Sequence, residues 1–314
     1  MTRWNNMREQ VEEYLDVRRR LGYQLKIPGK ELLCFARFAD MHESHKILTI
    51  DLAVEWASTS TSKLNRARRL EMIRGLAKYC VLFEPETQIP PPGLLGPAHR
   101  RLTPYIYTSQ ELFDLMQAAA NLNMGEGLRP ATIQNLLGLL SATGLRISEA
   151  LHLSRADIDF ESNLLVVKET KFNKSRHVPL HPTTVDALKD YARFRDKSVP
   201  VTFGTDAFFI LDKGYPLTYR HALYSFQTIR RQMAWRKKRL PRIHDLRHTF
   251  ACNRLLSWYE EGIDVNNAIL MLSVYLGHAK VTDTYWYLTG IPSLMSIAAD
   301  RFERYSGGET WLNR

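Results

Sequence analysis

The sequence predicts a mainly α-helical protein with a small β-sheet, divided into two domains. Its 314 residues exceed the roughly 100 to 200 that one domain usually holds. Apolar residues recur at helical spacing through most of the chain, whereas β-type runs are short and few. Prolines accumulate between residues 85 and 104, and such a stretch cannot continue a helix. We therefore expect a helical domain over 1–100, a linker over about 85–104 and a second domain over 105–314.

The first domain is predicted to contain only helices, packed on one small core. Pro28 and Gly29 separate the first two helices. A run of serines and threonines at 58–62 offers N-cap groups to the last helix. The four helices are expected over residues 11–21, 32–39, 51–56 and 64–83.

The second domain is predicted to combine helices with a β-hairpin. Residues 164–167 and 177–180 are short β-type runs on either side of a polar turn, and a further strand is expected over 208–211. Helices are expected over residues 112–119, 130–140, 147–151, 182–194, 218–237, 243–259, 265–276 and 292–305. The last of these is amphipathic, so it could pack on its own domain or on a neighbouring subunit.

The chain is basic, which favours an acidic partner. Lys and Arg number 43 against 33 Asp and Glu, for a formal net charge of +10. Nucleic acid is the commonest acidic partner, although a protein that merely happens to be basic fits the charge equally well. Clustered basic residues are either a solvated face or contacts to phosphate. The candidate DNA contacts are Arg66, Arg68, Arg69, Lys174, Arg176, Arg230 and Arg231.

Several classes of protein are excluded by motifs that the sequence lacks. Three cysteines far apart form neither a disulfide framework nor a CxxC metal motif, and we expect them to be buried free thiols. There is no GxxxxGK[ST] or GxGxxG nucleotide loop and no GxSxG nucleophile elbow. No apolar run approaches the roughly 20 residues that cross a bilayer. We expect a cytoplasmic, nucleoid-associated protein that uses no cofactor and no membrane.

His244 and His248 lie four residues apart, which is also the spacing of two zinc ligands on one helix face. Asp245 stands where a zinc protease has glutamate, and Arg247 would set a fixed positive charge beside the metal. Both features argue against zinc, so no metal is expected. If the target is a phosphodiester, His244 and Arg247 would instead present a hydrogen-bond donor and a guanidinium to one phosphate.

A second arginine, Arg146, follows a glycine break in the segment Thr143-Gly-Leu-Arg-Ile-Ser-Glu149. The break precedes a new helix, and the backbone N–H groups at a helix N-terminus favour anions. Considered alone, Arg146 could equally be a surface arginine without a function.

Five segments follow one another along the chain: the Arg146 motif, Lys171 in the hairpin turn, His244–His248, Leu276-Gly-His278 and a tyrosine that closely follows. In this order, these segments resemble the tyrosine recombinase (phage integrase) family. The resemblance covers residues from about 105 to 300, and the helical first domain is similar in shape to the family's SAM-like core-DNA-binding domain. It implies that this domain and an α+β catalytic domain form a C-shaped clamp on DNA, with chemistry that needs no cofactor.

The resemblance implies a role for each matching side chain. Lys171 would protonate the leaving 5′ oxygen, and Lys174 is a competitor in the same turn that could contact phosphate only. Glu149 would be a buried carboxylate that supports the arginine pocket. The residues expected to grip or hydrogen-bond the scissile phosphate, or to assist proton transfer there, are Arg146, Arg247, His244 and His278.

Tyr287 is expected to be the nucleophile. The family's tyrosine usually lies nine positions after the histidine of the Leu-Gly-His segment, and Tyr287 stands nine positions after His278. Tyr285 is the alternative in the same segment. Tyrosine is a poor nucleophile at its free pKa near 10, so adjacent guanidinium charge is expected to favour the phenolate.

The implied function is site-specific DNA recombination of the integrase or transposase type, in which strands are cleaved and rejoined through a 3′-phosphotyrosyl intermediate. The expected partner is double-stranded DNA with inverted-repeat core sites, bound by a homotetramer or by a tetramer that includes related recombinases. Two alternatives are a type IB topoisomerase, which relaxes DNA alone, and a DNA-binding regulator with an idle pocket. Integration, excision, dimer resolution and transposition all use the same chemistry.

Overall fold

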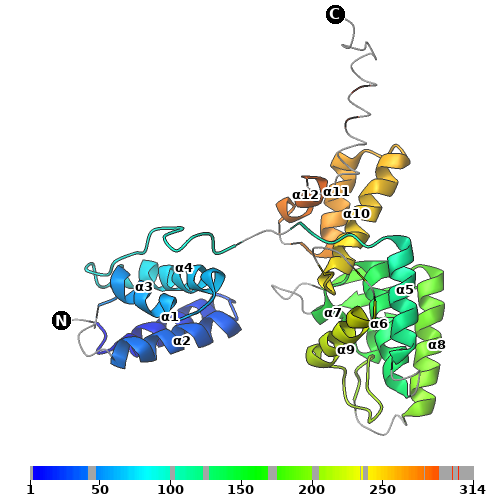
Figure 1. Ribbon diagram of the computed structural model, residues 1–314, viewed down its shortest axis with the longest axis horizontal. Coiled ribbons are helices and arrows are strands. Elements are labelled where there is room, and N and C mark those ends of the chain that lie inside the picture. Colours follow the sequence, from blue (N-terminus) through cyan, green and yellow to red (C-terminus); the bar gives the residue numbers. More distant parts are fainter. Residues whose placement is uncertain are drawn as a thin grey trace, which may run out of the picture. The chain divides into compact units, whose positions relative to one another are not determined.

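The chain forms two compact units in the computed structural model, Met1–Leu102 and Thr103–Arg314. Helices dominate both units, and one small sheet lies in the second, which confirms the predicted fold class (Figure 1). The residues that the structure describes are 3–41, 47–99, 103–122, 127–168, 175–199, 205–233, 235, 240–278, 280–289, 299 and 303.

The described residues of the first unit form four helices. Side-chain caps begin three of them, and Pro28 lies in the first turn of the remaining one, α2, where a missing N–H costs nothing. For this reason α2 begins earlier than the sequence pattern predicts. The rings of Phe35 and Trp56 meet edge to face in the core, with centroids 5.4 Å apart. The helices are α1 (Met7–Arg20), α2 (Lys26–Met41), α3 (Ile50–Ser58) and α4 (Lys63–Cys80).

The second unit is organised around α6. This helix has buried residues along its whole length and packs against α5, α8 and α10. It ends at Gly144, which has a left-handed φ of 63°. The helices are α5 (Ser109–Ala120), α6 (Leu128–Thr143), α7 (Ile147–Leu151), α8 (Pro182–Ser198), α9 (Tyr219–Gln232), α10 (His244–Glu260), α11 (Val265–Leu276) and α12 (Thr282–Thr289).

The sheet has three antiparallel strands in the order β1 (Ile158–Asp159), β2 (Leu164–Val167) and β3 (Arg176–Pro179). The predicted hairpin is present as β2 and β3, whose buried residues Leu165 and Val178 are paired. Residues 169–174 of its turn, and with them Lys171 and Lys174, lie outside the described residues.

The predicted strand over 208–211 is wrong. This segment makes one isolated bridge, Ile210 with Pro216, and the residue before it, Ala207, makes another with Ser154. Pro216 has no N–H with which to extend a ladder, so the run does not become a strand. Phe208, Phe209 and Ile210 are nevertheless buried in the core, whereas Leu211 is only partly buried.

The predicted helix over 218–237 is also too long. It ends at Gln232, because Met233 adopts an extended conformation with φ −77° and ψ 124°. Trp235 then packs its ring against Tyr105 and Tyr107, with centroids 6.4 and 5.9 Å away. The helix expected over 292–305 lies outside the described residues, apart from residues 299 and 303.

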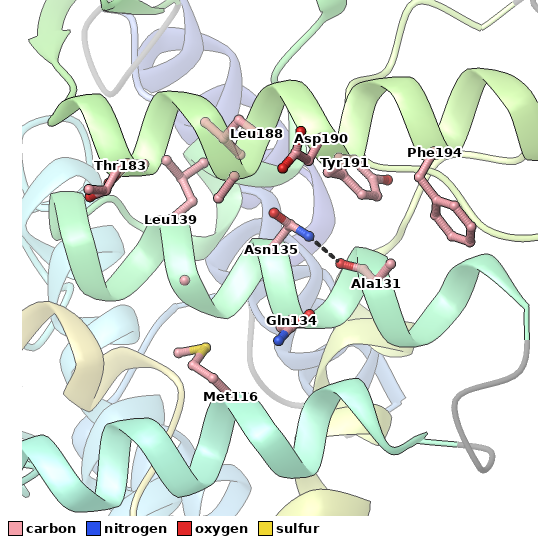
Figure 2. Close-up of a pocket in the computed structure, with 13 residues that line it drawn as sticks. Met116, Ala131, Gln134, Asn135, Leu139, Thr183, Leu188, Asp190, Tyr191 and Phe194 are labelled. Carbon is pink, nitrogen blue, oxygen red and sulfur yellow. Dashed lines mark hydrogen bonds between the residues drawn. The ribbon is translucent and has the colours of Figure 1, made fainter.

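A pocket of about 500 Å³ lies between α6 and α8, with Met116 of α5 at its edge (Figure 2). Asn135 faces this pocket and donates a hydrogen bond to the carbonyl of Ala131 on its own helix at 2.9 Å. Tyr191 and Phe194 of α8 line the pocket on its other side. Its lining includes none of the residues predicted to be catalytic, so the candidate site lies elsewhere.

Two further expectations concern cysteines and membrane spans. Cys80 and Cys252 are buried free thiols as expected, whereas Cys34 is only partly buried. Among the described residues, no helix combines the length and the apolarity needed to cross a bilayer.

Candidate active site

Three of the predicted catalytic residues, Arg146, Arg247 and His278, meet at the C-terminal end of α11. Gly277 follows the helix in a left-handed conformation, with φ 66°. The N–H of His278 donates to the carbonyl of Ser273 at 3.0 Å, and the N–H of Gly277 donates to that of Val274 at 2.9 Å. This is the Schellman arrangement, which leaves the next three carbonyls without a partner inside the helix. The helix dipole also gives this end a partial negative charge.

Three arginines donate to these three carbonyls. Arg176, Arg247 and Arg146 bind the carbonyls of residues 275, 276 and 277 in turn, at 2.8, 2.7 and 3.1 Å. The arginines come from β3, from α10 and from the residue that precedes α7. The end of α11 therefore gathers guanidinium groups from three separate elements.

Glu149 joins two of these arginines. Its carboxylate accepts hydrogen bonds from the backbone N–H and Nη1 of Arg146 at 2.9 and 2.8 Å. It also accepts from Nη2 and Nη1 of Arg176, at 2.9 and 3.1 Å. Burial raises the pKa of Glu149, but the hydrogen bonds and charge of both arginines leave it lowered overall. The Glu149 side chain is 7% exposed, whereas that of Arg146 is 35% exposed and can reach a ligand.

Arg247 is only 2% exposed and is held by backbone on two sides. Besides the carbonyl of Leu276, it binds the carbonyl of Gly144 through Nη1 at 2.8 Å. Burial and the nearby charge of Arg146 lower the pKa of Arg247 to about 10, so the guanidinium stays charged at neutral pH. A Cβ at Gly144 would lie 2.5 Å from the ring of Phe250, so glycine is required where α6 ends.

His244 is the first residue of α10. The next residue, Asp245, is fully buried and accepts hydrogen bonds at 2.8 Å from the backbone N–H and from Nη2 of Arg242, which fixes the start of the helix. Desolvation of the ring and the charge of Arg247 lower the pKa of His244 to about 4, although the residue keeps access to solvent. His244 is therefore neutral at pH 7.

His278 lies directly after Gly277 at the end of α11. Its Nδ1 is 2.7 Å from the hydroxyl of Thr284, which is fully buried on α12. Desolvation and the charge of Arg247 lower the pKa of His278 to about 4, so this ring is also neutral at pH 7.

The two candidate nucleophiles on α12 differ in their surroundings. Tyr287 is 3% exposed, and its ring stacks on that of His278 with centroids 6.2 Å apart and an interplanar angle of 18°. Tyr285 is 43% exposed, because two positions along a helix turn by about 200° and reach opposite faces. Burial raises the pKa of Tyr287, and the charge and hydrogen bond of Arg247 oppose that effect without cancelling it. The guanidinium of Arg247 therefore favours the phenolate as expected, while burial keeps the pKa of Tyr287 above its usual value.

Two residues that the sequence analysis did not place in the site also lie in it. The ring of His248 lies between those of His244 and Tyr287, with centroid distances of 4.7 and 5.5 Å. Its four-residue spacing from His244 is the sequence signal that places both rings on one helix face. The described residues contain no group of three His, Cys, Asp or Glu that could hold a metal. Thr284, the partner of His278, carries no sequence signal.

The predicted DNA contacts have varied surroundings. The Arg176 side chain is only 12% exposed and is turned into the ion pair with Glu149. On α9, Arg231 is exposed, whereas Arg230 donates to the carbonyl of residue 241 at 3.2 Å. All three predicted contacts on α4 have intramolecular partners: Arg66 donates to the carbonyl of Ser60 at 2.6 Å, Arg68 to that of Ala98 at 3.3 Å, and Arg69 to Glu31 at 3.0 Å.

Comparisons with known sequences agree on one family. The model of the phage integrase family matches residues 106–290. The chain is 38% identical over 308 residues to y4rB, a Sinorhizobium fredii protein whose name classes it as an integrase or recombinase, covering 96% of this chain and 98% of that protein. It is 32% identical over 234 residues to the tyrosine recombinase XerC of Chlamydia trachomatis, covering 74% of this chain and 69% of XerC.

Solved structures share the fold. The XerH site-specific recombinase in a post-cleavage complex with its palindromic difH substrate is 21% identical, with a TM-score of 0.66 over 94% of this chain and 84% of that one. The Tn1549 transposon integrase bound to a circular intermediate DNA is 16% identical, with a TM-score of 0.67 over 95% and 99%. The sequence matches, and not these structural ones alone, establish the family. The chain belongs to the phage integrase family and is a site-specific recombinase of the tyrosine type.

Proposed function

We propose that this recombinase cleaves and rejoins DNA strands through covalent attachment to Tyr287. The observation that carries the proposal is the position of Tyr287. Its ring is buried against those of His248 and His278, and the charge of Arg247 acts to lower its pKa. Tyr285, in contrast, is exposed to solvent. Double-stranded DNA is the substrate, in keeping with the net charge of +10.

In the proposed reaction, the Tyr287 oxygen attacks the scissile phosphorus while the bond from phosphorus to the 5′ oxygen breaks. Arg146 and Arg247 stabilise the charge that develops on the nonbridging oxygens. Lys171 gives a proton to the leaving 5′ oxygen, a role that rests on the family resemblance. The phosphodiester bond is exchanged for a 3′-phosphotyrosyl bond, so a 5′ hydroxyl of the partner strand can reverse the step without ATP.

The histidines of the site suit this reaction because they are neutral at pH 7. With pKa values of about 4, His244 and His278 can each donate one N–H to a phosphate oxygen or accept the proton of the phenol. A protonated histidine could donate to a phosphate oxygen but could not accept the proton of the phenol. Neutral rings therefore fit both the cleavage step and its reversal.

Strand exchange also requires an assembly. Four strands of two duplexes must be cut, so we propose a homotetramer, or a tetramer with related recombinases, on inverted-repeat core sites. In that assembly the unit Met1–Leu102 is the core-DNA-binding domain, and together with the catalytic unit it clamps the duplex.

The test is whether a protein–DNA adduct that resists denaturation forms on nicked duplex DNA taken from the flanks of the gene. We expect the adduct with the wild-type chain, its loss with Tyr287→Phe, and its retention with the matched control Tyr285→Phe. Loss only with Tyr285→Phe would move the nucleophile to the exposed position and overturn the proposal.

Two other results would point to the alternatives. Specific binding without any adduct would favour a DNA-binding regulator. Relaxation of supercoiled plasmid at sites of any sequence, with no exchange between duplexes, would favour a type IB topoisomerase activity.

A further inference from the structure

We propose that Arg176 is a positioning residue, which keeps the guanidinium of Arg146 available to the scissile phosphate by sharing the carboxylate of Glu149. The inference deepens the proposed function and rests on it. It replaces the DNA contact that the sequence predicts for Arg176.

The guanidinium of Arg176 is used by protein groups on both of its edges. Nε donates to the carbonyl of Tyr275 at 2.8 Å, while Nη1 and Nη2 donate to the two carboxylate oxygens of Glu149. The side chain is 12% exposed, and it reaches from β3 to the end of α11. A residue fixed in this way joins the hairpin, α7 and α11 at one point.

Gly277 shows how close this contact is. A Cβ placed on Gly277 would lie 2.8 Å from Nη1 and 3.0 Å from Cζ of Arg176. The guanidinium therefore lies directly against the backbone of the residue whose carbonyl accepts from Arg146. The glycine between Leu276 and His278 permits both the left-handed turn and this approach.

The charges explain why the contact matters for the reaction. One carboxylate, Glu149, serves two guanidinium groups, so the three side chains carry a net charge of +1. Without Arg176, Glu149 could pair through both of its oxygens with Arg146 alone, and the pair would be neutral. Arg146 would then be drawn away from the carbonyl of Gly277 and would offer less charge to a phosphate.

The variant to test is Arg176→Met, with Arg195→Met as its matched control. Arg195 is also buried in the second unit, and it likewise binds one carboxylate and one carbonyl, those of Asp196 and Phe208, at 2.8 and 2.9 Å. Loss of stability alone should therefore affect both variants. Arg176→Lys is a second variant that keeps the charge beside Glu149 but cannot bind all three acceptors.

Adduct formation is measured in single turnover at saturating nicked duplex DNA from the gene's flanks. We expect Arg176→Met to be slower by about 10- to 100-fold, the cost of a misplaced catalytic group, and Arg176→Lys to lie between it and the wild type. Arg195→Met should stay within about threefold of the wild type. An equal loss in Arg176→Met and Arg195→Met would mean that Arg176 is merely structural.

The same rates are then compared on DNA whose scissile phosphate is a methylphosphonate. This substitution removes the negative charge that Arg146 must neutralise, so the difference between wild type and Arg176→Met should shrink to less than about threefold. A structural role predicts the same difference on both substrates. A DNA contact predicts weaker binding with a smaller salt dependence and unchanged cleavage of bound DNA.

A crystal structure of Arg176→Met without DNA separates this inference from the proposed function. We expect Arg146 to leave the carbonyl of Gly277 and to bind both oxygens of Glu149. If Arg146 keeps its wild-type position, the inference is wrong. If Arg146 moves as expected but the wild-type chain forms no adduct on any DNA, the proposed function fails while the positioning role stands.

Discussion

Arginines occur in clusters in both units, and the two clusters are built differently. On α4, Arg66 and Arg68 each bind one backbone carbonyl, and Arg69 binds the side chains of Glu31 and Thr59. In the second unit, Arg247 and Arg146 bind carbonyls at the end of α11, and Arg247 is almost completely buried. Arginines that lie close together in the sequence are therefore not the ones that the fold holds most rigidly.

The difference has an energetic basis. Arg69 and Glu31 form an ion pair that is partly exposed, and such pairs contribute little because water screens them. An α4 arginine can therefore exchange its partner for a DNA phosphate at small cost. Arg247 is desolvated, and the carbonyls of Gly144 and Leu276 would lose their donor if it moved. It is held in place before any substrate arrives, which is what stabilisation of a transition state requires.

The largest effect should come from the arginines at the end of α11, Arg146 and Arg247. Arg247→Ala is expected to slow adduct formation by at least about 1,000-fold and to lower the free energy of unfolding by a few kcal/mol, because two buried carbonyls lose their donor. Arg247→Lys should restore little, since one ammonium cannot replace the planar fork. Single-turnover cleavage and urea denaturation measure the two effects. A variant that cleaves at a normal rate would show that the buried cluster is not catalytic.

The three arginines on α4 should give a smaller effect, on DNA binding and not on cleavage. Replacing Arg66, Arg68 and Arg69 together with glutamine is expected to weaken DNA binding about tenfold and to reduce the slope of log affinity against log salt by up to about 3. Cleavage at saturating DNA should stay within about twofold of the wild type. Fluorescence anisotropy across a salt series measures the binding. An unchanged slope would mean that α4 does not contact phosphate.

The sequence predicts features that depend on local signals better than features that depend on tertiary contacts. Helical periodicity and glycine breaks place most helices and the hairpin, because those signals are local. The apolar run at 208–211 has a strand's composition, but its one bridge, between Ile210 and Pro216, does not extend into a ladder. The nine-residue spacing that the family resemblance implies favours Tyr287 over Tyr285, and the fold gives the two residues different environments. The role of Arg176 could not be inferred from sequence, because its partners lie 27 and 99 positions away.

The smallest predicted effect is on the pH dependence of stability. It comes from His248, whose ring lies near those of His244 and Tyr287. Desolvation lowers the pKa of His248 to about 3, and the nearby charge of His244 acts in the same direction. In the unfolded chain this ring has a pKa of about 6.5, so below that pH the unfolded state binds a proton that the folded state does not. Stability is therefore complete above about pH 6.5 and is lost as the pH falls toward 3.

His248→Gln removes this contribution. Because the ring is only half-buried, the loss of unfolding free energy between pH 7 and pH 4.5 should become smaller by on the order of 1 kcal/mol. Urea denaturation at a series of pH values measures it, with the wild type measured in parallel. Identical pH dependence in wild type and His248→Gln would show that protons reach the ring freely. The neutral state of His248 would then not be a property of the site. The contrast with the α4 arginines would hold for Arg146 and Arg247 alone.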